Sequence, residues 1–225
     1  MTDDVEQCRV AIVLHPPVHS DPPKSLCSFA NSLSDRFIQR GMLSDLDQAI
    51  DLNRATLALC PPGHSYRSMA LNSLANSLSD RFQQRSGLSD LDEAIDLHRA
   101  ALALCPPGHS GQSISLNNLA SCLSVRFKQR GVLSDLDEAI DLHRAALALH
   151  PPGHSGRSRS LNNLAISLSD RFKQRGMLSD LDEAIDLDRA ALALCPLVIF
   201  VDPCLSTTLL AVSVTDSSSK VFCLT

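Results

Sequence analysis

The chain has 225 residues, 44% of them apolar and 20% charged, which is typical of a soluble globular protein and excludes collagen-like, strongly charged disordered and multi-span membrane chains. A formal charge of −5 leaves no basic surface for nucleic acid phosphates or anionic lipid. Aromatic residues make up only 4% and Trp is absent, so the stacking side chains of single-strand binders are missing too. Neither nucleic acid nor a membrane is therefore expected as a partner.

The N-terminus reads Met1-Thr2-Asp3-Asp4, which is acidic where a secretory signal is basic, and the apolar run at 10–14 is shorter than the core of such a signal. We therefore expect a cytoplasmic protein. In that reducing compartment the eight Cys residues should remain thiols, because their density is far below that of a disulfide-stabilised domain.

The most informative feature is a repeat with a period of 45 residues. Pro-Pro-Gly-His-Ser occurs at 61–65, 106–110 and 151–155, and Pro-Pro-Val-His-Ser occurs at 16–20. The repeats predict a solenoid domain over 1–196, followed by an irregular, apolar, Ser/Thr-rich tail over 197–225. The domain divides into a half-unit at 1–19 and four units at 20–64, 65–109, 110–154 and 155–196.

Each unit contains the pattern of two helices, as the third unit illustrates. Its first apolar stripe has helical spacing and predicts a helix that ends at Gly131, a residue suited to the left-handed conformation after a helix. Ser134 and the acidic residues behind it predict the N-cap of a second helix, which the Pro-Pro-Gly string at 151–153 ends. The first stripe consists of Leu116, Leu119, Ala120, Leu123 and Phe127.

The second helix of each unit has apolar residues on two adjacent sides, so more than one neighbouring helix must cover it. In the third unit these sides are Leu136, Ala139, Ile140, His143 and Leu147, and Leu142, Ala146 and Leu149. Stacking provides that cover, because the second helix can contact the first helix of its own unit and that of the next unit. The expected fold is therefore all-α, an α-solenoid of antiparallel helix pairs.

HEAT and armadillo repeats have a similar length, but the order of large and small apolar residues is that of the tetratricopeptide repeat, extended beyond its standard length of about 34 residues. The extra residues lengthen the first helix over 124–130 and the loop that contains the Pro-Pro-Gly-His-Ser string. The matching residues are Leu116, Leu119, Ala120 and Leu123 on the first helix, and Ala139, Ala146 and Pro151 on the second.

The pattern resembles long tetratricopeptide repeats of the kinesin-light-chain type, which share the Leu-Asn-Asn-Leu-Ala string seen at 116–120 and 161–165. It resembles still more closely the repeat arrays of fungal proteins in which such units precede a caspase-like CHAT domain. The resemblance covers about residues 4–196 and implies a right-handed superhelix. Nothing in the rest of the sequence resembles a protease domain.

The resemblance implies a concave groove, lined by the first helices, that binds an extended peptide or a partner domain. Amides in such a groove can both donate to and accept from a peptide backbone. The alternative is that they only bond neighbouring helices or water. The residues at these positions are Asn72, Asn117 and Asn162 in one row, and Asn31, Asn76 and Ser121 in a second row that Ile166 interrupts.

A recurring Asp-Arg pair follows one turn later, at 35–36, 80–81 and 170–171, with Val125 replacing the Asp in the third unit. The arginines could bind acidic residues of a partner. Alternatively, they form solvated or inter-repeat ion pairs of small energetic value, an interpretation that we favour. The four candidates are Arg36, Arg81, Arg126 and Arg171.

Two patterns of His, Cys and Ser could suggest chemistry, but their repetition argues against it. Positions 15, 60, 105, 150 and 195 read His, Cys, Cys, His, Cys, yet equivalent atoms in stacked helices lie about 8–10 Å apart or more, too far for one zinc ion. The His-Ser pairs at 64–65, 109–110 and 154–155 do not form one catalytic constellation, and we expect their serines to cap the next helix. No enzyme, metal or cofactor is therefore expected.

The leading hypothesis is thus a non-catalytic scaffold for protein–protein interaction. The alternatives are a regulatory repeat fragment of a larger CHAT-type protease-like protein and a truncated duplicate without activity. Because the second helix of the fourth unit is followed by the irregular tail instead of another first helix, we also expect end-to-end self-association.

Overall fold

The computed structural model describes residues 22–106 and 111–194, which form eight α-helices and contain no strand. The all-α class is therefore confirmed. The half-unit at 1–19 and the tail at 197–225 lie outside the described residues. The helices are α2 (Pro22–Arg40), α3 (Leu43–Ala58), α4 (Arg67–Arg85), α5 (Leu88–Ala103), α6 (Gln112–Arg130), α7 (Leu133–Ala148), α8 (Arg157–Arg175) and α9 (Leu178–Leu194).

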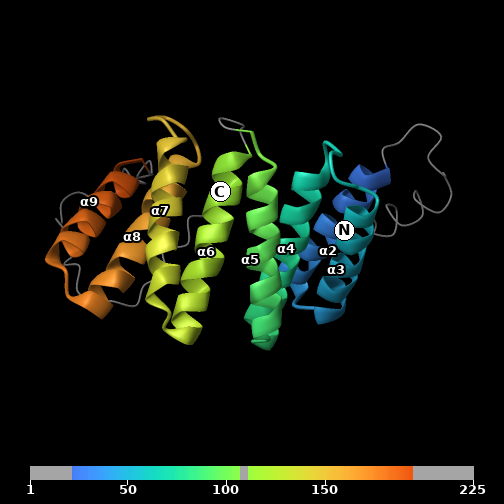
Figure 1. Cartoon of the computed structure of the whole chain (residues 1–225), viewed down its shortest axis with the longest axis horizontal. Coiled ribbons are helices and arrows are strands. Elements are labelled where there is room, and N and C mark those ends of the chain that lie inside the picture. The colour runs from blue at the N-terminus through green and yellow to red at the C-terminus, as the bar shows by residue number, and fades with distance from the viewer. Residues whose placement is uncertain (1–21, 107–110, 195–225) are drawn as a thin grey trace, which may run out of the picture. The chain divides into compact units, whose positions relative to one another are not determined.

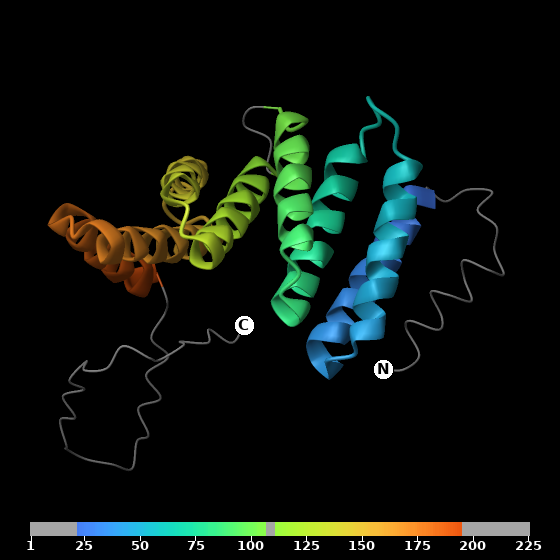
Figure 2. The ribbon, with the colours of Figure 1, turned by 60° about the horizontal axis from the view of Figure 1, so that its bottom comes forward.

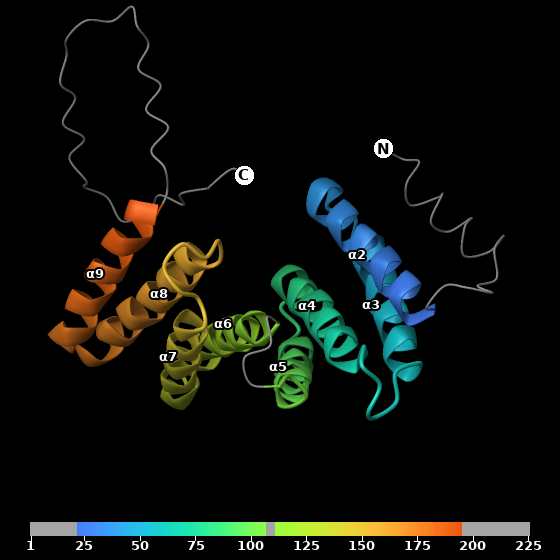
Figure 3. The same ribbon diagram turned by 90° about the horizontal axis from the view of Figure 1, so that it is seen from above.

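The eight helices form four antiparallel hairpins that follow one another in chain order (Figure 1). We call α2, α4, α6 and α8 the A helices, and α3, α5, α7 and α9 the B helices. Each B helix packs against the A helix before it and, where one follows, the A helix after it, as Figures 2 and 3 show from two further directions. The predicted α-solenoid is thus confirmed.

The two sets of helices are not equivalent in this stack. The backbones of successive A helices approach one another, α2 with α4, α4 with α6 and α6 with α8. In the described part of the chain no such approach joins one B helix to the next. One side of the stack is therefore formed by neighbouring A helices alone.

The apolar stripe predicted for the third unit lies in the core between the hairpins. Leu119 and Leu123 are almost completely buried, at 2% and 0% exposure, and belong to a cluster that includes residues of α3, α4 and α5. On the B helix, Leu136 and Ile140 are fully buried. The second predicted stripe is only partly covered: Ala146 is fully buried and Leu142 is half-buried, but Leu149 is exposed because it follows the last turn of α7.

The end of each A helix matches the prediction. Gly131 follows α6 with φ of 70°, and its N–H bonds the carbonyl oxygen of Phe127 at 2.7 Å. Gly41 and Gly176 have the same left-handed conformation, which glycine adopts without steric cost. In the second unit Ser86 takes this place with φ of 55°, so a non-glycine residue is tolerated there.

The predicted serine N-caps are wrong. The helix α7 begins at Leu133, one residue before Ser134, and its N-cap residue Val132 makes no side-chain capping bond. The carboxylate of Asp135 is engaged by Arg126 instead, while its N–H bonds the carbonyl of Val132 at 3.1 Å. The carboxylate in the first turn of α7 therefore forms an ion pair with α6 of the same unit and does not cap the helix.

The serines of the His-Ser pairs do not cap the A helices either. The N-cap residues of α4 and α8 are Tyr66 and Gly156, without a side-chain capping bond. The preceding histidine acts locally: Nδ1 of His64 accepts from the N–H of Tyr66 at 3.1 Å, and Nδ1 of His154 from that of Gly156 at 3.0 Å. The third pair, at 109–110, lies outside the described residues.

Candidate interaction surface

The four arginines of the recurring Asp-Arg pairs bind inside their own units. Each donates two hydrogen bonds from Nε and Nη2 to the carboxylate of an aspartate in the first turn of the following B helix. These bidentate pairs are among the strongest polar contacts in proteins. The geometry favours the structural interpretation of these arginines. The pairs are Arg36–Asp45, Arg81–Asp90, Arg126–Asp135 and Arg171–Asp180.

Three of these arginines also link one unit to the next. Arg126 lies 3.3 Å from Asp92 of the preceding B helix, and Arg130 lies 2.7 Å from the same carboxylate. Burial opposes ionisation of Asp92, but the hydrogen bonds from Arg130 and Arg126 outweigh it and lower its pKa. Asp47 and Asp137 occupy the same place in the first and third units. The described stack therefore repeats one ionic joint at each junction.

A buried polar link accompanies this joint. The amide nitrogen of Asn117 donates to Oγ of Ser160 at 3.1 Å, so its oxygen is left to accept from Nδ1 of His143 at 3.1 Å. Asn72 makes the same pair of bonds, with Ser115 and His98. Burial lowers the pKa of both histidines to about 4, because an imidazolium would lose its hydration. These histidines therefore remain neutral parts of the core.

The two rows predicted to bind a peptide thus lie in different environments. Asn72 and Asn117 bond within the stack, and Asn117 is buried at 8% exposure. Asn162, in the last unit, is exposed. The second row is exposed throughout, at Asn31, Asn76, Ser121 and the interrupting Ile166. A peptide-binding role remains a prediction, and it is best supported for the second row.

A comparison between units shows a surface that the sequence analysis missed. The B helices α5 and α7 have the same 16 residues, whereas the A helices α4 and α6 differ at eight of their 19 positions. Five of these eight form one stripe, with spacing i, i+4, i+7, i+11 and i+14. They are Met69, Ser73, Asn76, Asp80 and Gln83 in α4, and Ile114, Asn118, Ser121, Val125 and Lys128 in α6.

We call this stripe, with the positions 45 residues away in α2 and α8, the A-face. All of its residues are exposed or half-buried. Neighbouring stripes touch: the amide nitrogen of Asn118 donates to the Asn76 oxygen at 3.1 Å, and Lys128 lies 3.0 Å from Asp170. Ile38 of α2 lines the same hollow as Asp80 and Gln83 of α4. Each stripe therefore adjoins the next, and residue-by-residue comparison of the repeats would have revealed the A-face from the sequence.

The A-face combines polar residues with separate exposed apolar side chains. Met69 and Ile114 are 53% and 58% exposed near the start of their helices, and Ile38 is 72% exposed near the end of α2. Ile166 is 45% exposed. Polar groups interrupted by apolar anchors suit contact with protein, since protein interfaces have this mixed character.

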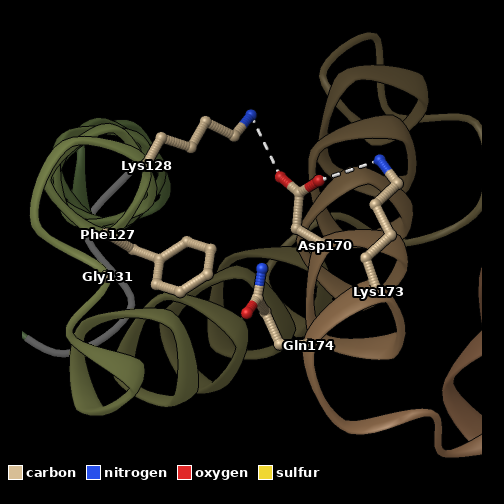
Figure 4. Close-up of a pocket in the computed structure, with 6 residues that line it drawn as sticks. All are labelled: Phe127, Lys128, Gly131, Asp170, Lys173 and Gln174. Atoms are coloured by element: carbon tan, nitrogen blue, oxygen red, sulfur yellow. Dashed lines mark hydrogen bonds and ion pairs between the residues drawn. The ribbon is translucent and has the colours of Figure 1, made fainter.

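Two hollows lie between consecutive A helices, at equivalent positions. One, of about 260 Å³, is lined by residues of α6 and α8, among them Phe127, Lys128, Asp170 and Lys173 (Figure 4). Both lysines converge on the Asp170 carboxylate, at 3.0 Å and 3.2 Å. The other, of about 300 Å³, lies between α2 and α4 and is lined by Phe37, Ile38, Gly41, Asp80, Gln83 and Gln84.

The remaining candidates for chemistry stay dispersed in the described part of the chain. No group of three His, Cys, Asp or Glu residues there could hold a metal ion, and Cys27, Cys105 and Cys122 are free thiols. At the Cys/His position, His150 bonds Ser160 at 2.9 Å, and Cys105 lies 4.0 Å from the equivalent Ser115. Positions 15 and 195 are outside the described residues. None of the helices described is long and apolar enough to cross a membrane.

Comparison with known proteins found a matching repeat family and similar folds. The model of the tetratricopeptide repeat family matches residues 68–109, which include α4 and α5. No significant match was found among curated proteins. Among solved structures, nearly identical TPR-like repeats of a proposed kinesin light chain from Podosopora anserina are similar, with a TM-score of 0.61, 17% identity and coverage of 85% of this chain and 87% of that one.

Two further structures have the same fold. BtubC (BKLC) from P. vanneervenii gives a TM-score of 0.58 at 19% identity, covering 96% of this chain and 82% of its own. The MamA protein gives 0.53 at 14% identity, covering 84% and 79%. The chain therefore has the α-solenoid fold of these structures, and its residues 68–109 match the tetratricopeptide repeat family. Its repeats resemble those of the kinesin-light-chain type, as the sequence predicted.

Proposed function

We propose that this solenoid is a non-catalytic scaffold that binds a peptide or partner domain on its A-face. Tetratricopeptide repeats generally mediate protein–protein interaction, and their fold provides a surface whose variable residues select the partner. The observation that carries the proposal is the location of sequence differences: the B helices α5 and α7 are identical, while every position of the A-face stripe differs between α4 and α6.

The exposed residues of the B helices also support a variable A-face and a constant B-helix side. They form a repeated, purely ionic contact between B helices, Arg54–Glu93, Arg99–Glu138 and Arg144–Glu183. These residues are unchanged from one junction to the next, which suits a structural role. The residues proposed to contact the partner are Asn31, Asn76 and Ser121 from the sequence analysis, together with Met69, Ile114 and Ile166 of the A-face and the exposed Asn162 next to it in α8.

A matched pair of double variants tests this proposal. Met69→Glu with Ile114→Glu adds two charges to the A-face, and Ala100→Glu with Ala145→Glu adds two charges to exposed positions of α5 and α7. Peptides selected from a random library on the wild-type protein would be measured by fluorescence anisotropy. We expect the A-face variant to bind at least about 10-fold more weakly, because desolvating the new carboxylates opposes binding, and the control to bind like the wild type. Equal binding by both variants would contradict the A-face as the site.

Two other functions remain alternatives: a regulatory repeat fragment of a CHAT-type protein, and a duplicate without activity. An inactive duplicate predicts that no peptide is selected at all. A regulatory fragment predicts instead that a CHAT-type protease-like domain, added as the ligand, binds to the A-face. The cytoplasmic location expected from the N-terminal sequence also stays a prediction.

End-to-end self-association has a defined ionic candidate. Inside the stack, Arg85 pairs with Asp47 of the preceding unit at 2.8 Å. The equivalent Arg40 of α2 and Asp182 of α9 have no such partner among the described residues. If they pair between molecules, sedimentation should show concentration-dependent dimers that Arg40→Glu removes and that Arg40→Glu with Asp182→Arg restores. A monomer at all concentrations would contradict this arrangement.

A further inference from the structure

In each unit, one A-face residue lies directly before the arginine of the bidentate Arg–Asp pair. Its environment differs from unit to unit. Asp35 of α2 is exposed. Val125 of α6 is half-buried and packs against the core cluster. Asp170 of α8 lies between Lys128 and Lys173, with 13% of its side chain exposed. Asp80 of α4 is also half-buried, but its surroundings differ in charge.

The hollow beside Asp80 has the same framework as the hollow beside Asp170, without the cations. Phe37, Gly41 and Gln84 line it where Phe127, Gly131 and Gln174 line the other. Ile38 stands at the position of Lys128, and Gln83 at that of Lys173. The two sites therefore share four equivalent lining residues, including the carboxylate, and differ in the two residues that would neutralise it (Figure 4 shows the neutralised site).

No cation within the described residues replaces these lysines at Asp80. The nearest guanidinium groups along α4 are committed elsewhere: Arg81 binds Asp90 and Asp47, and Arg85 binds Asp47. Burial raises the pKa of the Asp80 carboxyl, with no charged group acting in the opposite direction. An ionised carboxylate in this position is poorly solvated, and an opposite charge would stabilise it.

We propose that the Asp80 hollow binds a lysine or arginine side chain of the partner peptide, whose cation takes the place that Lys128 occupies beside Asp170. The inference rests on the proposed function and specifies the chemistry of its partner. The volume of about 300 Å³ is at the lower limit for ligand pockets, which suits one side chain. The aliphatic stem of that side chain would lie on Ile38, which is 72% exposed, and on the ring of Phe37.

A double-mutant cycle between the protein and the peptide tests the inference. Peptides would be selected from a random library on the full chain, and each selected Lys or Arg would be replaced by norleucine in a labelled copy. We expect one such replacement to weaken binding to the wild type about 10-fold, which corresponds to about 1.4 kcal/mol. The same replacement should have little effect on Asp80→Asn, because the carboxylate that binds the cation is gone.

Exchanging equivalent residues between the two hollows gives two further variants. Ile38→Lys places an internal ammonium where α6 has Lys128, and it should abolish the preference for a cationic residue while the protein stays folded, since Ile38 is exposed. Lys128→Ile with Lys173→Gln removes both cations from Asp170 and should create a second site with the same preference. Circular dichroism and thermal unfolding would confirm that each variant is folded.

The outcomes separate this inference from the proposed function. Selected peptides without Lys or Arg, or an equal effect of norleucine on the wild type and on Asp80→Asn, would overturn the Asp80 site and leave the A-face proposal intact. Failure to select any peptide would overturn both. A cation preference that Asp80→Asn and Ile38→Lys both remove would support the site.

Discussion

Between the second and third units, the A helices differ in sequence and the B helices do not. The two B helices, each of which contacts A helices on two sides, are identical. The two A helices keep their buried Leu and Phe residues, differ at two buried positions with small side chains, and differ at all five positions of the exposed stripe. A residue that must fit two neighbours has little freedom to change. Most residues of the A-face are exposed to solvent, so they can change with less damage to the stack.

Core truncation should give the largest effect. Leu123→Ala removes a fully buried side chain from the cluster between hairpins and should lower the free energy of unfolding by about 2–5 kcal/mol. The A-face control Ile114→Ala, at a site 58% exposed, should change it by no more than about 0.5 kcal/mol. Urea unfolding followed by circular dichroism measures both, and equal effects would contradict the division between core and A-face.

Acidic pH should lower the free energy of unfolding through two buried histidines. His98 and His143 have folded-state pKa values lowered to about 4 from the usual 6.5, so the unfolded state takes up protons first. Above about pH 6.5 both histidines are neutral in the folded and unfolded states, and stability is at its full value. It decreases as the pH falls toward 4. At pH 5 the loss should be on the order of 2 kcal/mol for each histidine.

The first unit suggests the control for this pH effect, because it carries Asn53 at the equivalent position. The double variant His98→Asn with His143→Asn should lose most of the pH dependence between pH 7 and pH 5. Urea unfolding at both pH values would measure it. An unchanged pH dependence in the double variant would assign the effect to other groups.

Loss of a bidentate arginine should have a smaller but clear effect. Arg126→Ala leaves Asp135, whose side chain is only 8% exposed, without its partner, and should cost about 1–3 kcal/mol. Arg99→Ala breaks a pair in which both side chains are more than 40% exposed and should cost at most about 0.5 kcal/mol. Thermal unfolding of the two variants compares them. Similar losses would mean that burial does not determine the strength of these pairs.

The smallest effect is expected at Asp80, and its sign is opposite. Burial raises the pKa of this carboxyl in the folded protein, so its ionised form opposes folding and stability increases as the pH falls. Asp80→Asn should therefore raise stability at neutral pH, by up to about 0.5 kcal/mol, and the gain should disappear at acidic pH. A loss of stability at neutral pH would indicate that the carboxylate makes a favourable contact within the chain.

The repeat period and the apolar stripes were enough to predict the stack. Leu116, Leu119 and Leu123 lie on one side of an A helix, and a B helix that is apolar on two sides can be covered only by two neighbours. Gly131 likewise predicted the helix end, since its conformation depends on local sterics. These features depend on short segments, which is why the sequence alone defines them.

The tertiary structure decided which polar residues face inward. Asn72 and Asn76 are one turn apart and similar in sequence context, yet Asn72 bonds His98 and Ser115 while Asn76 is exposed. Ser134 has the sequence of an N-cap, but the adjacent Asp135 is held by an arginine of the preceding helix. The partners that decide these roles lie on other helices, as many as 43 residues away, so only the packing of successive units places them.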